Sequence, residues 1–228
     1  MTSLSLASCY LTGGKSTGAA GGLNQRDFSG LQVLCDALQL SSTVRTLDLS
    51  RNALQSEGAC ILGAMLESNE SITALDISSN DLTNDGTSAE GIAELARVLQ
   101  LNDHLSSLVI ASNSLCGMRA VIDPNLEPKR RRGDAFRLVG EYRPRPALEL
   151  LRALRGTQVM NLLDLSNNGL GGGQDLDEGC AAQVEQVLGA VVETIRKSWL
   201  LNIRMCDNAV SDQMKERMQR QCGERLVL

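Results

Sequence analysis

One spacing of apolar residues recurs along the chain and limits its possible folds more than any other feature. Apolar residues fill positions 1, 4, 6 and 11 of an eleven-residue template, and an asparagine or cysteine fills position 9. The six copies begin at Met1, Val44, Ile72, Leu105, Met160 and Leu200. Six complete copies indicate a tandem repeat, in which each unit buries its apolar face against its neighbours.

Each copy predicts a short strand followed by a turn. Apolar residues alternate at positions 4 and 6, which indicates a strand with one buried face. The predicted strands lie near residues 4–6, 47–49, 75–77, 108–110, 163–165 and 203–205. A buried amide at position 9 can donate to and accept from the backbone of adjacent units. The predicted structural ladder is therefore Cys9, Asn52, Asn80, Asn113, Asn168 and Asn208.

Helical patterns separate the strands. The last helical leucine precedes the next template by six residues in four units, at Leu38, Leu66, Leu99 and Leu154. A strand, a helix and a second strand running in one direction require a right-handed parallel crossover. The predicted fold is an α/β solenoid, a right-handed arc with a parallel β-sheet on its concave face and α-helices on its convex face.

The repeated unit resembles the leucine-rich repeat family. Residues 47–66, LDLSRNALQSEGACILGAML, are most similar to the long subtype typified by ribonuclease inhibitor, in which a helix follows each strand. The resemblance extends from residue 1 to about residue 220. It implies one repeat domain over 1–222 with about six repeats, a C-terminal tail at 223–228, and a role in binding another protein.

Three insertions interrupt the repeat. The template starts are separated by 43, 28, 33, 55 and 40 residues, and the extra length falls between a strand and its helix. The insertions at 12–27, 116–145 and 171–178 are thus expected to project from one rim of the arc. Such insertions often gather on the binding face of a solenoid. The alternative is that loops tolerate added length at small cost.

The second insertion has an unusual charge. Residues 116–146 hold all four prolines, and eight basic residues against four acidic ones in a chain of net charge -5. Lys129, Arg130, Arg131 and Arg132 form an unbroken basic run. The run is a candidate docking site for an acidic partner or a nuclear-localisation signal. A solvated loop without a partner is the simpler and favoured interpretation.

The outward strand positions are small, polar and mildly acidic. The candidate partner-binding residues on this face are Asp48, Arg51, Asp76, Asp164 and Arg204. Aspartate and serine here also match the family's own pattern, so they identify no particular partner. No large aromatic anchor of the kind found at interface hot spots stands among the outward strand residues.

The motifs that would indicate catalysis are absent from the sequence. The run Gly13-Gly14-Lys15-Ser16-Thr17 is not a phosphate loop, because Cys9 stands where the motif needs a glycine. No nucleophile motif or metal-ligand spacing occurs. We therefore expect no enzyme activity, no cofactor and no metal. The net charge argues against nucleic acid as a partner, and no apolar stretch is long enough to span a membrane.

The cysteines and the two ends complete the sequence-based interpretation. Seven scattered cysteines favour a reducing, cytoplasmic location, with the nucleus as a further destination if 129–132 acts as a signal.

A charged capping helix is expected from Ser211 onward. The first strand has no such cap, so its edge is either open or covered by another molecule. The oligomeric state stays open.

The leading functional hypothesis is an intracellular scaffold that binds a protein partner through its concave face and insertion-bearing rim. The alternative is a regulator of a small GTPase. Ran GTPase-activating proteins are similar in repeat type, but they have more repeats and an acidic tail, which this sequence lacks. A turnover assay with a panel of small GTPases would separate the two hypotheses.

Overall fold

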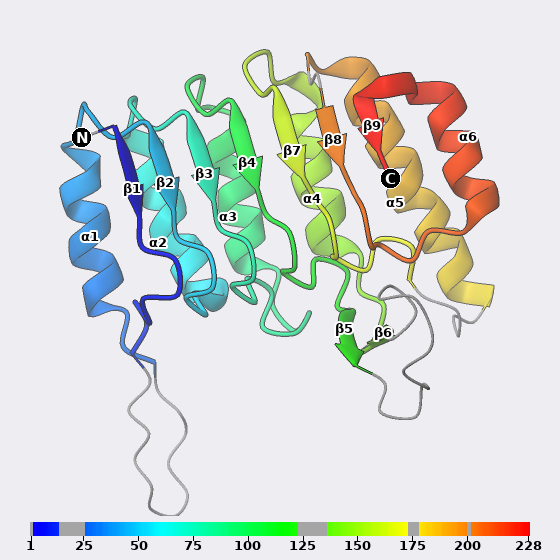
Figure 1. Ribbon diagram of the computed structural model, residues 1–228, viewed down its shortest axis with the longest axis horizontal. Coiled ribbons are helices and arrows are strands. Elements are labelled where there is room, and N and C mark those ends of the chain that lie inside the picture. The colour runs from blue at the N-terminus through cyan, green and yellow to red at the C-terminus, as the bar shows by residue number, and fades with distance from the viewer. Residues whose placement is uncertain (1, 14–25, 123–135, 173–177, 200–201) are drawn as a thin grey trace, which may run out of the picture.

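Seven parallel strands form one sheet in the computed structural model, which describes residues 2–13, 26–122, 136–172, 178–199 and 202–228 (Figure 1). Their order is β1 (Ser3–Ser5), β2 (Thr46–Asp48), β3 (Ala74–Asp76), β4 (Ser107–Val109), β7 (Leu162–Asp164), β8 (Asn202–Arg204) and β9 (Leu226–Val227). Leu47, Leu75, Leu108 and Leu163 are direct register partners on successive strands. The repeats therefore stack in the predicted register.

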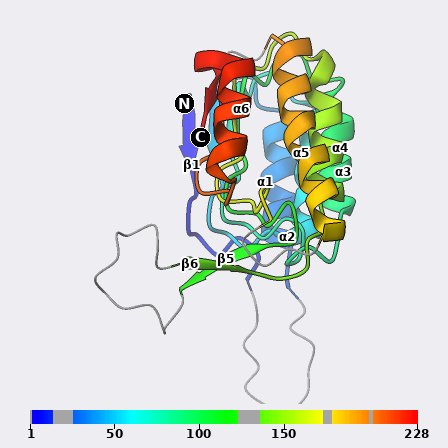
Figure 2. The same cartoon turned by 90° about the vertical axis from the view of Figure 1, so that its right-hand side faces the viewer.

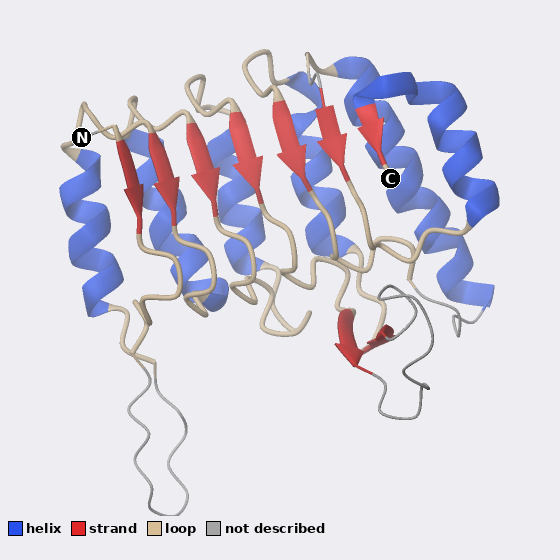
Figure 3. Ribbon diagram, in the orientation of Figure 1, coloured by secondary structure: helices blue, strands red, loops and turns tan. Residues whose placement is uncertain are grey.

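Helices cover one face of this sheet and leave the other face open (Figures 2 and 3). They are α1 (Ser29–Gln39), α2 (Gln55–Ser68), α3 (Glu90–Leu99), α4 (Arg145–Ala153), α5 (Glu178–Lys197) and α6 (Asp212–Cys222). Strands and helices alternate along the chain as the template requires, so the predicted α/β solenoid is confirmed. None of the described helices combines the length and apolar character that crossing a bilayer requires.

The core between the sheet and the helices is aliphatic. Leu47, Leu49, Leu54 and Leu62 of one repeat are fully buried, and the equivalent residues of neighbouring repeats continue the same layer. Each fully buried leucine contributes about 1.5–3 kcal/mol to folding. Aromatic residues make up only 2% of the chain, so this stacking of leucine rows supplies most of the buried apolar surface.

The strands begin and end one residue before the predicted ranges. Leu49, the position-6 residue of its repeat, still donates its backbone N–H to Asp76 O at 2.8 Å. Two residues later the chain turns sharply at Arg51, whose φ is +57°. The turn at the ladder position therefore ends each three-residue strand one residue earlier than predicted.

The last residues form structure instead of the expected tail. Residues Gly223–Arg225 make a short 3-10 helix, and β9 follows it and pairs with β8 in parallel. Leu226 is 2% exposed, and Met205 N donates to Val227 O at 2.8 Å. Residues 226–227 thus extend the sheet beyond β8, and Leu226 packs into the apolar core.

The long insertion contains a β-hairpin. Two antiparallel strands, β5 (Arg119–Ile122) and β6 (Phe136–Val139), lie beyond the C-terminal ends of the sheet strands (Figures 1 and 2). Helix α4 begins at Arg145, within the expected insertion, and α5 begins at Glu178. The basic run at Lys129–Arg132 and most of the insertions at 12–27 and 171–178 lie outside the described residues.

Two helical glycines should respond oppositely to alanine. A Cβ at Gly189, in the middle of α5, would meet no atom within 4 Å, so Gly189→Ala should stabilise the protein by about 0.5–1 kcal/mol through helix propensity. A Cβ at Gly91 in α3 would lie 2.5 Å from Ser56 O, so Gly91→Ala should destabilise it. Urea unfolding of both variants tests the packing, and midpoints that move in the same direction would contradict it.

Candidate interaction surface

The turns after the strands are held by a ladder of buried asparagines. Asn80 Oδ1 accepts the backbone N–H of Asn52 at 2.8 Å, and Asn80 Nδ2 donates to Leu49 O and Ile77 O, each at 3.0 Å. The same bonds recur at the other asparagines of position 9, which are Asn52, Asn113, Asn168 and Asn208. All of them are at most 3% exposed. Each turn therefore has a fixed shape and fixed outward positions.

Cys9 occupies the ladder position of the first repeat, and its thiol does not make the bonds to adjacent repeats that the asparagine amides make. Its thiol contacts only Ala7 O, at 3.5 Å, and its side chain is exposed. The Cys9 backbone N–H still donates to Asn52 Oδ1 at 2.9 Å. Within the described residues, the second repeat therefore holds the first turn through the Cys9 amide.

Two further asparagines, on the opposite rim, hold turns that lead from a helix into the next strand. Asn69 Nδ2 donates to Leu38 O at 2.7 Å and Asn102 Nδ2 to Leu66 O at 2.9 Å. Sequence reasoning missed this pair. Its signal is an asparagine three residues before the template, as at Asn69 before Ile72.

The residues on either side of each ladder position have left-handed backbone angles, and several of their side chains are exposed at the rim. Arg51 has a φ of +57° and is exposed. Tyr10 has a φ of +53° and is 85% exposed. Sequence reasoning selected Arg51 but missed Tyr10, because it searched the strands for an aromatic anchor. The signal was an aromatic residue between the ladder position and the last apolar position of the template.

The open face brings four of the five predicted outward residues into one row. Asp48 and Asp76 are register partners on β2 and β3, and Asp164 and Arg204 are register partners on β7 and β8. Val109 on β4 separates the two pairs. Neighbouring strands lie about 4.8 Å apart, so the side chains of register partners are close together. The row is acidic over β2 and β3, and it places Asp164 beside the cation of Arg204 over β7 and β8. Arg51 lies apart from this row, at the rim.

The carboxylates of this row also hold their own turns. Asp48, Asp76 and Asp164 each accept the backbone N–H of the serine two residues on, at 2.9–3.0 Å. Burial opposes ionisation of Asp48, but hydrogen bonds from Ser50 and Ser5 and the charge of Arg51 outweigh it and lower its pKa. The aspartates are therefore fixed in position, with one oxygen committed to the local turn.

The base of the β5–β6 hairpin is fastened to the rim by close backbone contacts. A Cβ at Gly117 would lie 2.4 Å from Glu141 O, and one at Gly140 would lie 2.2 Å from Gly117 O. Tyr142, buried beside them, donates its hydroxyl to Leu170 O at 2.9 Å. The two ends of the insertion are thus joined to each other and to the next repeat, which fixes where the hairpin leaves the solenoid.

The arginines at the end of this insertion are already paired. Arg143 contacts Glu141 at 2.6 Å, and Arg145 contacts Glu149 at 2.8 Å. The Arg143–Glu141 pair is exposed, whereas Glu149 is half-buried, and exposed ion pairs add little to stability. The excess positive charge of the insertion therefore belongs to its remaining basic residues, including Lys129, Arg130, Arg131 and Arg132, which lie outside the described ranges.

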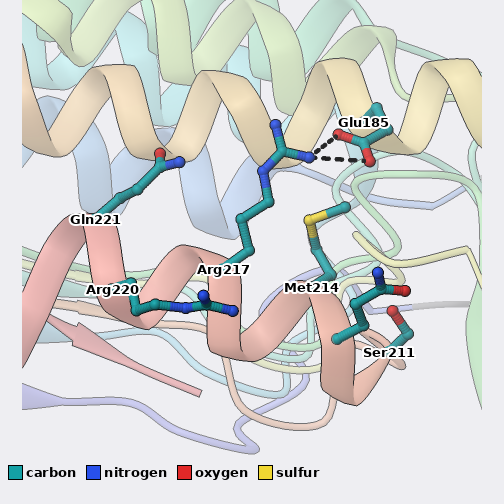
Figure 4. Close-up of a pocket in the computed structure, with 7 residues that line it drawn as sticks. Glu185, Ser211, Met214, Arg217, Arg220 and Gln221 are labelled. Carbon is teal, nitrogen blue, oxygen red and sulfur yellow. Dashed lines mark hydrogen bonds and ion pairs between the residues drawn. The ribbon is translucent and has the colours of Figure 1, made fainter.

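A pocket of about 430 Å³ lies between α5 and α6 (Figure 4). Its lining is Glu185, Ser211, Gln213, Met214, Arg217, Arg220 and Gln221. Arg217 pairs with Glu185 at 3.2 Å, and Arg220 pairs with Glu216 at 3.7 Å. Both cations of the pocket are compensated by neighbours, so it is not built to receive an anion. Across the described ranges, no three His, Cys, Asp or Glu side chains gather as metal ligands would.

One family model and one solved structure are similar to parts or all of this chain. Residues 40–59 and 68–89 match a family model described as Leucine Rich repeat, and these stretches contain the second and third copies of the template. No curated protein sequence matches the chain. A solved structure titled "Leiomodin-1 Actin-Binding Site 2 (ABS2)" is 17% identical, with a TM-score of 0.47, over 97% of this chain and 87% of that chain.

Proposed function

We propose that this leucine-rich repeat protein, which we place in the ribonuclease-inhibitor-like subtype, binds a protein partner across its open sheet face and the rim beside it. The observation that carries the proposal is the asymmetry of the sheet: helices cover one face, and none of the described helices covers the other. The subtype assignment rests on the full α-helix that follows most of the strands in the described repeats.

Charge suggests the chemistry of the partner. The paired carboxylates of Asp48 and Asp76 favour a basic group opposite β2 and β3, whereas Arg204 favours an acidic group opposite β8. A partner whose charges run in the complementary order would be oriented along the sheet, because complementary potentials fix register and suppress wrong partners. Val109 supplies an apolar contact between the two charged regions.

The rim supplies the residues suited to dominate the binding energy. Tyr10 and Arg51 stand on the turns of adjacent repeats, and tyrosine and arginine are enriched at interface hot spots. Their turns are held by the asparagine ladder, so little ordering would be required on binding. We include the basic run Lys129–Arg132 as a contributor, because the described base of the insertion leaves the solenoid at the same rim.

The test removes charge from the open face without removing the turn bonds. Asparagine keeps an acceptor oxygen for the serine N–H, so the double variant Asp76→Asn, Asp164→Asn should retain its stability. We expect partners recovered by affinity purification and mass spectrometry with the wild type to fall at least about tenfold with this variant, since a lost charge contact commonly costs more than 1.4 kcal/mol.

Two comparisons make the test decisive. The matched control is Asp36→Asn on the outer surface of α1, where the carboxylate accepts a bond from Gln32, and it should leave recovery unchanged. Deletion of 123–135 measures the contribution of the basic run. Equal recovery of every partner by the wild type and by the open-face variant would contradict binding through the sheet.

A further inference from the structure

The chain contains a single tryptophan, and that residue is exposed. Trp199 follows α5, which ends at the rim where the sheet strands begin (Figure 1). The residue is 69% exposed, although tryptophan is on average among the more buried residue types. An aromatic side chain offers a large apolar area, so its burial against another molecule would be favourable.

The backbone beside the indole is held by two neighbouring elements. Trp199 N donates to Thr157 O at 3.3 Å, directly after the 3-10 helix Leu154–Gly156. The carbonyl of Ser198, which is buried, accepts a bond from Arg225 Nη2 at 3.2 Å. The turn that carries the indole is therefore already positioned, which lowers the ordering cost of binding.

Positive charge gathers on the elements that meet at this turn. Residues 152–157, 193–199 and 223–225 hold five basic side chains and two acidic ones, in a chain of net charge -5. Glu193 is already paired, with Arg155 at 2.9 Å and Lys197 at 3.8 Å. Burial raises the pKa of the Cys222 thiol, and the charges of Arg225 and Arg196 act against that rise, so both cations lie near this thiol.

The helix ends of this fold do not by themselves require such cations. Basic residues in a last turn complement the helix dipole, but α1 and α2 have none there. Leu101 is also 69% exposed, in the turn after α3, yet Arg97 of that helix is paired with Glu67 and Glu94. Exposed apolar residues thus recur on this rim, and the described part of the chain combines one with an excess of cations at Trp199.

We propose that Trp199, Arg152, Arg196 and Arg225 form a docking surface for an acidic segment of a partner protein that carries an apolar side chain among its carboxylates. The apolar side chain covers the indole, and the carboxylates pair with the guanidinium groups, which suit them in geometry and charge. Tryptophan and arginine are both enriched at interface hot spots. The surface lies on the rim opposite to Tyr10 and Arg51, so it is separate from the open-face contact.

The charges of the whole rim favour a protein segment over larger anionic surfaces. A flat anionic lipid surface would also meet the exposed carboxylates of Glu70 and Asp103, which lie in the turns before β3 and β4. A long nucleic acid would be repelled by a chain of net charge -5. A short acidic segment contacts the cations at Trp199 and avoids both repulsions.

Fluorescence tests the proposal on the full chain, because Trp199 is its only tryptophan and reports on its own surroundings. The probe is a fluorescein-labelled peptide in which glutamates flank a central pair of leucines. We expect its anisotropy to rise on binding, and the emission of Trp199 to move to shorter wavelength as the indole leaves water. Arg196→Glu and Trp199→Ser should each weaken binding of the labelled peptide at least about tenfold.

Three matched controls should bind the peptide as the wild type does. Leu101→Ser removes an equally exposed apolar side chain from the same rim, and Lys215→Glu makes the same charge reversal on α6. The open-face variant Asp76→Asn, Asp164→Asn separates this proposal from the one above. Circular dichroism shows whether each variant is folded.

Four results would each overturn the proposal. They are no binding up to about 1 mM peptide, binding that leaves the emission of Trp199 unchanged, wild-type affinity in Arg196→Glu, and an emission shift with phosphatidylserine vesicles but not with the peptide. The last result would assign the surface to lipid instead of protein.

Discussion

Replacing Asn80 with alanine is expected to lower the free energy of unfolding by about 3–4 kcal/mol. The substitution removes the acceptor for Asn52 N and the donor for Leu49 O and Ile77 O, in a site that is fully buried. Buried backbone groups that lose their partner cost about 1–3 kcal/mol each, and partial relaxation of the turn reduces the sum. Urea denaturation followed by circular dichroism measures the loss.

The matched control for this prediction is Cys9→Ala, at the same template position in the first repeat. Cys9 is exposed and its thiol makes one weak contact, so the change should stay within about 0.5 kcal/mol. Equal urea midpoints for Asn80→Ala and the wild type would show that the ladder does not hold the turns together.

Replacing Gly117 with alanine should destabilise the protein by about 3 kcal/mol. The residue has a φ of +73°, and its Cβ would lie 2.4 Å from the backbone oxygen of Glu141. Neither the conformation nor the backbone contact can be relieved by rotating a side chain. The base of the hairpin must therefore separate, which also strains the Tyr142 bond to Leu170 O.

Hydrogen exchange shows which part of the protein the Gly117→Ala substitution loosens. Amides of β5 and β6 should exchange faster in Gly117→Ala than in the wild type, while those of β2 and β3 keep their protection. Gly156→Ala is the control, because a Cβ there would meet no atom within 4 Å. An unchanged urea midpoint for Gly117→Ala, or slower exchange in the hairpin, would mean that the base is not closely packed.

The candidate surface was only partly predictable. The template places Asp48, Asp76 and Asp164 outward because strand residues alternate between two faces, and the structure has them there. The template also places Asp164 beside Arg204 on the next strand, but it did not indicate that each carboxylate holds a serine N–H. Tyr10 was missed because its exposure follows from the left-handed turn around the ladder position, which the strand pattern does not describe.

The hairpin and the two ends were decided by contacts between distant residues. Close packing of Gly117 against Glu141, and of Leu226 into the last core position, joins segments that share no periodic signal. The exposure of Leu4 and Leu6 likewise depends on the absence of a described strand beyond β1, and not on their own sequence.

The sequence by itself determined the repeat, its register and its asparagine ladder, because these depend on a short pattern that every unit satisfies against an almost identical neighbour. Tertiary structure alone decided how the hairpin is anchored and how β9 pairs with β8. At those places a unit meets something other than another unit, and the free energy depends on which surfaces remain to be covered.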